Sequence, residues 1–135
     1  MPLELLMPIE VLGHVSCGFP SPAGDYMENR IDLNKEVVKR PSSTFFFRVT
    51  GESMTGAFIP PDALLVVDRM EKARHGSIVL AVVDREFTVK RLLIEGTKRT
   101  LAPENPKFKP IHITEFSQVE IWGVVTHILT DAKTV

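Results

Sequence analysis

The sequence predicts a mostly β domain that follows an extended N-terminal arm, and three observations lead to this fold class. Short apolar runs rich in β-branched and aromatic residues recur beyond the first third of the chain. Turn-forming residues separate these runs, and no segment keeps a strong 3.6-residue period. The 135 residues match one ordinary domain, and 44% hydrophobic residues allow one core. We expect residues 1–40 to form the arm and residues 41–135 the β domain.

The arm is expected to contain little regular structure. Prolines interrupt the apolar residues of segment 1–14, which favours an extended, strand-like stretch. Residues 16–29 are rich in turn formers and helix breakers, which predicts an irregular segment accessible to proteases. Asp32 can cap a single helical turn over residues 32–36, and a turn at residues 41–43 ends the polar stretch that follows.

The pattern of the remaining residues predicts strands that are separated by turn-forming residues. The expected strands cover residues 45–49, 63–67, 77–83, 86–94, 100–102 and 119–129. Asp84 and Arg85 form the two-residue turn of a hairpin, and Gly123 marks a bulge or bend in the last strand. Residues 104–110 form a proline-rich loop, and residues 130–135 a frayed polar tail.

The composition of the chain argues against several classes of function and site. A net charge of −1 and dispersed basic residues argue against direct nucleic-acid binding through counterion release. The single cysteine, Cys17, excludes an intrachain disulfide and is typical of a reducing cytoplasm. Scattered histidines and the lack of CxxC or HExxH spacing predict no metal site and no cofactor. No apolar run reaches the ~18–20 residues of a membrane span, and the first residues lack a secretory n-region.

Ser53, in the turn sequence GESM, and Lys90, within a strand-like run, are the candidate reactive residues. A serine hydroxyl becomes a nucleophile when a base takes its proton. A lysine can be that base if its pKa falls from about 10.4 toward neutrality. Strand alternation puts Lys90 on the same face as Thr88 and Leu92, where burial would disfavour its charge. Taken singly, a turn serine and an edge-strand lysine are more often structural than catalytic.

Several segments, taken together and in order, resemble the LexA/UmuD family of self-cleaving serine–lysine peptidases. They are Cys17-Gly18, Gly51-Glu52-Ser53-Met54, Asp62 to Asp68, His75 to Ala81, Asp84 to Arg91, and Trp122 to Val125. The resemblance extends from about residue 8 to residue 130. It implies a β domain like that of LexA and signal peptidases.

The resemblance assigns a role to each candidate residue. It implies Ser53 as nucleophile, Lys90 as general base and the Cys17–Gly18 bond as the cleavage site. It also implies that the backbone amides of Glu52 and Ser53 bind the oxyanion, where fixed dipoles stabilise the tetrahedral intermediate. The arm is long enough to enter its own active site or that of a partner subunit.

The biological role implied by the resemblance is in the SOS DNA-damage response. A RecA filament on single-stranded DNA would promote self-cleavage by favouring a docked arm. The trimmed homodimer would then join the UmuC-like catalytic subunit of an error-prone translesion polymerase in the cytoplasm.

Three alternatives stay open. The first is a catalytically idle interaction module of the same fold, which would regulate the polymerase without cleavage. The second is a signal-peptidase-like enzyme acting on exported proteins, which would need membrane anchorage that the sequence lacks. The third is a repressor fragment, but only about 40 proline-broken residues precede the first core strand, too few for a DNA-binding domain.

Overall fold

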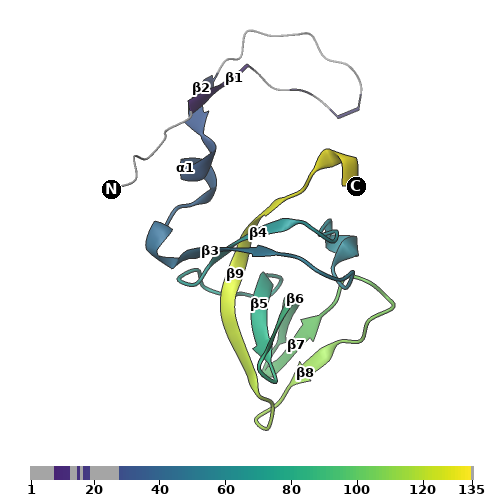
Figure 1. Ribbon diagram of the computed structural model, residues 1–135. Coiled ribbons are helices and arrows are strands. Elements are labelled where there is room, and N and C mark those ends of the chain that lie inside the picture. Colours follow the sequence, from purple (N-terminus) through teal and green to yellow (C-terminus); the bar gives the residue numbers. More distant parts are fainter. Residues whose placement is uncertain (1–7, 13–14, 16, 19–27, 135) are drawn as a thin grey trace. The chain divides into compact units, whose positions relative to one another are not determined.

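The chain divides into two compact units, Met1–Lys39 and Arg40–Val135 (Figure 1). The structure, a computed structural model, describes residues 8–12, 15, 17–18 and 28–134. Most of the segment expected to be irregular, residues 16–29, lies outside the described residues.

The described part of the first unit contains a two-stranded antiparallel sheet and a short helix. β1 (Pro8–Val11) pairs with β2 (Glu28–Asp32), and α1 (Leu33–Val37) follows directly. The Asp32 carboxylate accepts a hydrogen bond from the Asn34 N–H at 3.0 Å, which caps the helix. The predicted helical turn and its cap are therefore confirmed.

The prediction of an irregular segment up to residue 29 is wrong at its C-terminal end, where β2 begins. The polar residues of β2 carry no strand signal of their own, and pairing with β1 orders them. Ile31 lies opposite Ile9, and Arg30 Nη2 lies 2.7 Å from Glu10 Oε1. Both charged side chains are exposed, so the strand pairing rather than the ion pair defines this element.

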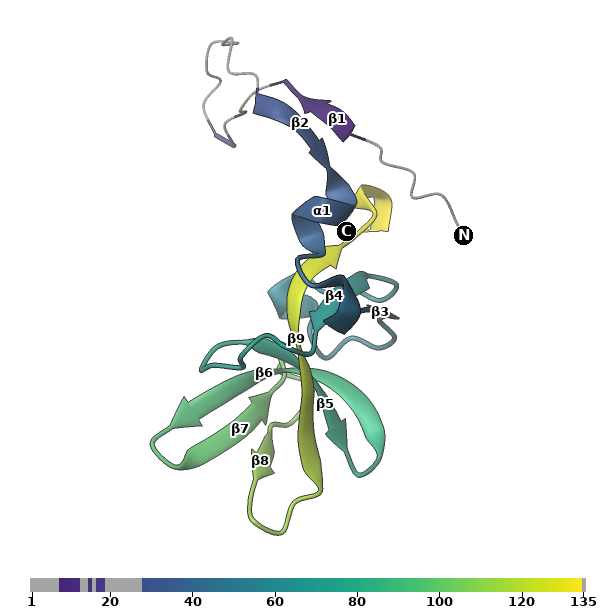
Figure 2. The same ribbon diagram turned by 90° about the vertical axis from the view of Figure 1, so that its left-hand side faces the viewer.

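Seven antiparallel strands form one sheet in the second unit, in the order β3-β4-β9-β5-β6-β7-β8. Their bounds are β3 (Thr44–Arg48), β4 (Leu64–Asp68), β5 (Ile78–Val83), β6 (Glu86–Glu95), β7 (Lys98–Ala102), β8 (Ile111–Ile113) and β9 (Val119–Leu129). The long strand β9 runs through the middle of the sheet (Figure 2) and pairs with both β4 and β5. The mostly β fold and every predicted strand are confirmed, but β8 was not predicted. Only three residues long, it is ordered by pairing with β7.

Helical structure in the described ranges of the second unit is limited to single 3₁₀ turns. These are η1 (Pro41–Ser43), η2 (Thr55–Ala57) and η3 (Ala132–Thr134). The last of them corrects the expectation of a frayed tail, because Asp131 Oδ1 accepts a hydrogen bond from the Lys133 N–H at 2.9 Å. None of the helices within the described ranges is long and apolar enough to cross a membrane.

The hairpin between β5 and β6 closes through Asp84 and Arg85, as predicted. Both residues have positive φ values, 49° and 70°, and the flanking Val83 and Glu86 are paired. Two successive positive φ angles define the type I′ turn, whose twist matches that of the flanking strands. This turn fixes the register of β6 and hence the position of Lys90.

The bulge predicted at Gly123 is confirmed. The pairing register of β5 with β9 shifts between Leu80, opposite Gly123, and Ala81, opposite Ile121. A Cβ atom at Gly123 would lie 2.7 Å from Val67 Cγ1, so the tight packing of β4 on β9 requires glycine here. The bulge bends β9 so that one strand serves both neighbours.

The core consists of two apolar clusters on opposite faces of the sheet, as the alternation along β5 shows. The first cluster contains Met54, Ile59, Ala63, Leu65, Val67 and Leu80. The second contains Val79, Ala81, Leu92, Leu101 and Val124. The first cluster extends beneath the GESM turn through Met54 and therefore supports the candidate site.

Candidate active site

Ser53 lies in the turn after β3, which the first cluster anchors. Gly51 has a φ of 86°, a conformation that favours glycine and lets the chain reverse. Met54, directly after the serine, is 3% exposed and packs into the cluster. The turn is therefore fixed to the core while the Ser53 side chain stays partly exposed.

Lys90 lies in the middle of β6 and is 8% exposed. Its Nζ donates hydrogen bonds to Ser53 Oγ at 2.9 Å, Thr88 Oγ1 at 2.7 Å and the Val89 carbonyl oxygen at 3.1 Å. Burial lowers the pKa of Lys90 from its ordinary value. No carboxylate in the described part of the chain forms an ion pair with this amine. The three hydrogen bonds to uncharged acceptors offset only part of the lost hydration, so burial shifts the equilibrium toward the neutral amine relative to an exposed lysine.

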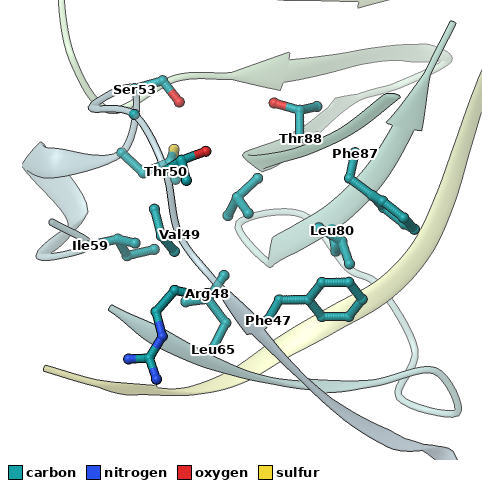
Figure 3. Close-up of a pocket in the computed structure, with 13 residues that line it drawn as sticks. Phe47, Arg48, Val49, Thr50, Ser53, Ile59, Leu65, Leu80, Phe87 and Thr88 are labelled. Carbon is teal, nitrogen blue, oxygen red and sulfur yellow. The ribbon is translucent and has the colours of Figure 1, made fainter. Parts of the chain in front are cut away.

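Thr88 joins the pair from the same strand. Residues two apart on a strand share a face, which brings the Thr88 hydroxyl to the Lys90 amine. Figure 3 shows the Ser53 and Thr88 hydroxyls directed toward one another across the mouth of a pocket. The sequence placed Thr88 on this face but assigned it no role. The spacing of two residues was the available signal.

The pocket beside Ser53 has a volume of about 200 Å³ (Figure 3). Its apolar lining residues are Phe47, Val49, Met54, Ile59, Leu65, Leu80, Phe87 and Val89, and Arg48 also lines it. Side-chain hydroxyls of Thr50, Ser53 and Thr88 supply polar groups. A pocket that combines apolar side chains with polar groups beside a serine hydroxyl could receive a side chain of a bound peptide.

The backbone amides of Glu52 and Ser53 lie in the same turn. Neither N–H donates a hydrogen bond to another group among the residues that the structure describes. Two adjacent N–H groups without an acceptor, next to a serine hydroxyl, are able to bind an oxyanion.

A second loop, at Glu104 and Asn105, contacts the turn and had no signal in the sequence. The Glu104 N–H donates to the Ser53 carbonyl oxygen at 2.8 Å, and Asn105 Nδ2 donates to the Glu52 carbonyl oxygen at 2.9 Å. This loop is 50 residues from the turn in sequence, so only the folded sheet brings the two together.

The predicted cleavage site, Cys17 and Gly18, belongs to the first unit. Both residues are exposed, and Gly18 has a φ of 144°, which favours glycine. Ser53 and Lys90 belong to the second unit.

The arrangement around Ser53 is accompanied by similarity to known proteins over most of the chain. Residues 10–126 match the peptidase S24-like family. The chain belongs to this family. It is 48% identical over 114 residues to protein ImpA of Salmonella typhimurium, covering 83% of this chain and 76% of that protein. Protein MucA of Escherichia coli is 46% identical over 121 residues, 89% of this chain and 82% of that protein.

A LexA repressor, from Anaeromyxobacter sp. (strain Fw109-5), is 33% identical over 129 residues, covering 94% of this chain and 56% of the repressor. Together these matches confirm the resemblance to the LexA/UmuD family that the sequence motifs indicated.

Proposed function

We propose that this chain is a self-cleaving serine endopeptidase that cuts its own Cys17–Gly18 bond, with Ser53 as nucleophile and Lys90 as general base. The observation that carries the proposal is the 2.9 Å contact between Ser53 Oγ and a buried lysine amine. Membership of the peptidase S24-like family supports the reaction class.

The geometry supports a two-step reaction. Neutral Lys90 takes the proton from Ser53 Oγ, which attacks the carbonyl carbon of Cys17. The Glu52 and Ser53 amides stabilise the oxyanion. The bond from that carbon to the Gly18 nitrogen breaks, and the leaving amine takes the proton from Lys90. Lys90 then deprotonates a water molecule, which hydrolyses the ester and restores Ser53.

The cleavage-site residues have properties that the reaction needs. An exposed segment can leave its surroundings and enter a groove at little cost, and Gly18 adds no side chain beside the attacked bond. We propose that the arm alternates between docked and undocked states and reacts only when docked. A partner that binds the docked state raises its population and therefore the cleavage rate.

The proposed cellular role is in SOS mutagenesis. A RecA filament on single-stranded DNA serves as the activating partner, and the trimmed chain acts as a homodimeric, cytoplasmic accessory subunit of an error-prone polymerase. Membership of the LexA/UmuD family supports this role.

Intact mass spectrometry after incubation at alkaline pH tests the reaction without any partner, because high pH supplies neutral Lys90. We expect a fragment that begins at Gly18, and we expect neither Ser53→Ala nor Lys90→Ala to produce it. A fragment formed equally by Ser53→Ala would rule out the serine mechanism. An intact wild-type chain at every pH, with the fold retained, would favour the idle interaction module.

A further inference from the structure

The loop at Glu104 and Asn105 holds the backbone carbonyls on both sides of the nucleophile. Glu104 makes two backbone hydrogen bonds with the turn. The Glu104 N–H donates to the Ser53 carbonyl oxygen at 2.8 Å, and the Gly56 N–H donates to the Glu104 carbonyl oxygen at 2.7 Å. Asn105 Nδ2 reaches the preceding carbonyl, that of Glu52, at 2.9 Å. The nucleophile turn is therefore paired with this loop like a short strand.

The loop backbone lies so close to the turn at Gly56 that there is no room for a side chain at this position. A Cβ atom added at Gly56 would lie 2.3 Å from the Glu104 carbonyl oxygen. Only glycine permits this contact without displacing the backbone. The contact between Gly56 and Glu104 therefore keeps the turn and the loop at a short distance from one another.

The Asn105 side-chain amide has partners at both ends. Its Oδ1 accepts a hydrogen bond from the Lys107 N–H at 3.0 Å. Its Nδ2 donates to Thr55 Oγ1 at 3.3 Å as well as to Glu52. Because the acceptor end is held within its own loop, the donor end is directed at the turn.

Holding the Glu52 carbonyl also directs the Ser53 N–H. The two groups belong to one planar trans peptide unit, in which C=O and N–H point in opposite directions. The Glu52 oxygen accepts hydrogen bonds from Asn105 Nδ2 at 2.9 Å and, within the turn, from the Thr55 N–H at the longer distance of 3.3 Å. With its oxygen held in this way, the unit directs the Ser53 N–H to the opposite side, where it has no acceptor among the described residues. Rotation of this peptide would turn the proposed oxyanion donor out of position.

The same loop is tied to the strand that carries the base. The Glu104 carboxylate accepts a hydrogen bond from Arg91 Nε at 2.5 Å, and Arg91 Nη1 donates to the Gly76 carbonyl oxygen at 2.6 Å. Arg91 directly follows Lys90 on β6. The loop therefore bridges the nucleophile turn and the base strand.

We propose that Asn105 is a positioning residue of the self-cleavage reaction, which holds the Glu52–Ser53 peptide so that the Ser53 N–H points at the developing oxyanion. This inference rests on the function proposed above. Asn105 touches neither the substrate nor the reacting atoms, and it acts through the backbone of the turn.

The test compares self-cleavage of the full chain across alkaline pH in wild type, Asn105→Ala, Asn105→Asp and Lys107→Ala, with Ser53→Ala as the inactive reference. Asn105→Ala removes the donor, and we expect the rate plateau at high pH to fall about tenfold to hundredfold. The midpoint of its pH–rate profile stays at the wild-type value, because Lys90 keeps its surroundings. Lys107→Ala is the matched control from the same loop, since its backbone N–H still binds Asn105, and it cleaves at the wild-type rate.

Asn105→Asp keeps the acceptor for the Lys107 N–H but has no donor, so it tests the same point if the alanine variant does not fold. We expect a fall in the plateau at least as large. Thermal melting identifies the folded variants. A wild-type plateau in a folded Asn105 variant overturns the inference while leaving the proposed function intact. An uncleaved wild type, or equal cleavage by Ser53→Ala, overturns the proposed function and the inference with it.

Discussion

The Lys90 amine has lost most of its water without gaining a carboxylate in the described part of the chain. A buried ammonium is disfavoured unless it is paired, and the three acceptors around Nζ are uncharged. The resulting lowered pKa suits a base that must be neutral to act. The burial of Lys90 thus lowers its pKa in the direction that the proposed reaction needs.

Because Lys90 is buried, we expect the free energy of unfolding to depend on pH. Its pKa is lower in the folded state than in the unfolded state, where it is about 10.4, so between the two values the unfolded chain binds more protons. The contribution of Lys90 to the free energy of unfolding therefore rises with pH and levels off above about 10.4. Lys90→Met removes this contribution.

We expect the stability of Lys90→Met, measured relative to its parent by urea unfolding in a Ser53→Ala background, to be greatest near neutral pH. The difference should decline toward pH 10.4 by about 1.4 kcal/mol for each unit by which burial lowers the pKa. A difference independent of pH would show that the folded state does not disfavour the charge on Lys90.

The hydrogen bond between Thr88 and the Lys90 amine leads to a second prediction at the scale of the residue, namely that Thr88 orients this amine. Thr88→Val keeps the side-chain shape but removes the acceptor 2.7 Å from Nζ. Losing one hydrogen bond that orients the base should slow self-cleavage about tenfold. Thr88→Ser is the matched control and should retain most of the rate. Equal rates for the valine and serine variants, measured by intact mass, would exclude an orienting role.

Among the elements, β9 depends on the close approach of the Val67 side chain on β4 to the backbone at Gly123. Gly123→Ala would bring a methyl group to 2.7 Å from Val67 Cγ1, and we expect a loss of about 1–3 kcal/mol in the free energy of unfolding. Val67→Ala removes the obstructing methyl group. In a double-mutant cycle by urea unfolding, the combined variant should therefore lose less than the sum of the two single losses. Additive losses would contradict the steric explanation.

At this scale the sequence was informative where local chemistry decides the structure. The β-branched runs, the Asp84–Arg85 turn and the bulge glycine each carry their own signal. β2 is polar and carries no such signal, and β8 has two β-branched residues but is only three residues long, so pairing with the neighbouring strand orders both. Short strands of this kind are beyond what residue preferences reveal.

The candidate site divides in the same way. The sequence marked Ser53 and Lys90 as candidates, and alternation along the strand placed Lys90 on the same face as Leu92. Asn105 could not be found, because an asparagine in a proline-rich loop is an ordinary turn residue. Its contact with Glu52 exists only after the sheet brings two distant loops together.

At the scale of the whole molecule, the second unit has a core of its own. The fully buried apolar side chains among the described residues all belong to the second unit. Its first residue, Arg40, donates a hydrogen bond to the buried Asp68 carboxylate at 2.6 Å. The second unit therefore contains its own core, and the Arg40–Asp68 contact holds its first residue to β4.

We expect residues 40–135 alone to fold cooperatively and to melt within about 5 °C of the full chain, as followed by circular dichroism. In that fragment, Arg40→Ala should lower the melting temperature, because Asp68 loses a charged partner. A fragment that does not melt cooperatively would show that the arm contributes to the core.

The most direct test of the Ser53–Lys90 pair compares two titrations. One is the rate of self-cleavage as a function of pH, measured by intact mass. The other is the titration of the Lys90 side chain, followed by NMR in the uncleaved Ser53→Ala chain. We predict that the rate rises with pH, that both curves share one midpoint, and that this midpoint lies below the ordinary lysine value of about 10.4. A Lys90 that titrates at its ordinary value, or a cleavage rate that does not follow its titration, would contradict the role of Lys90 as the base.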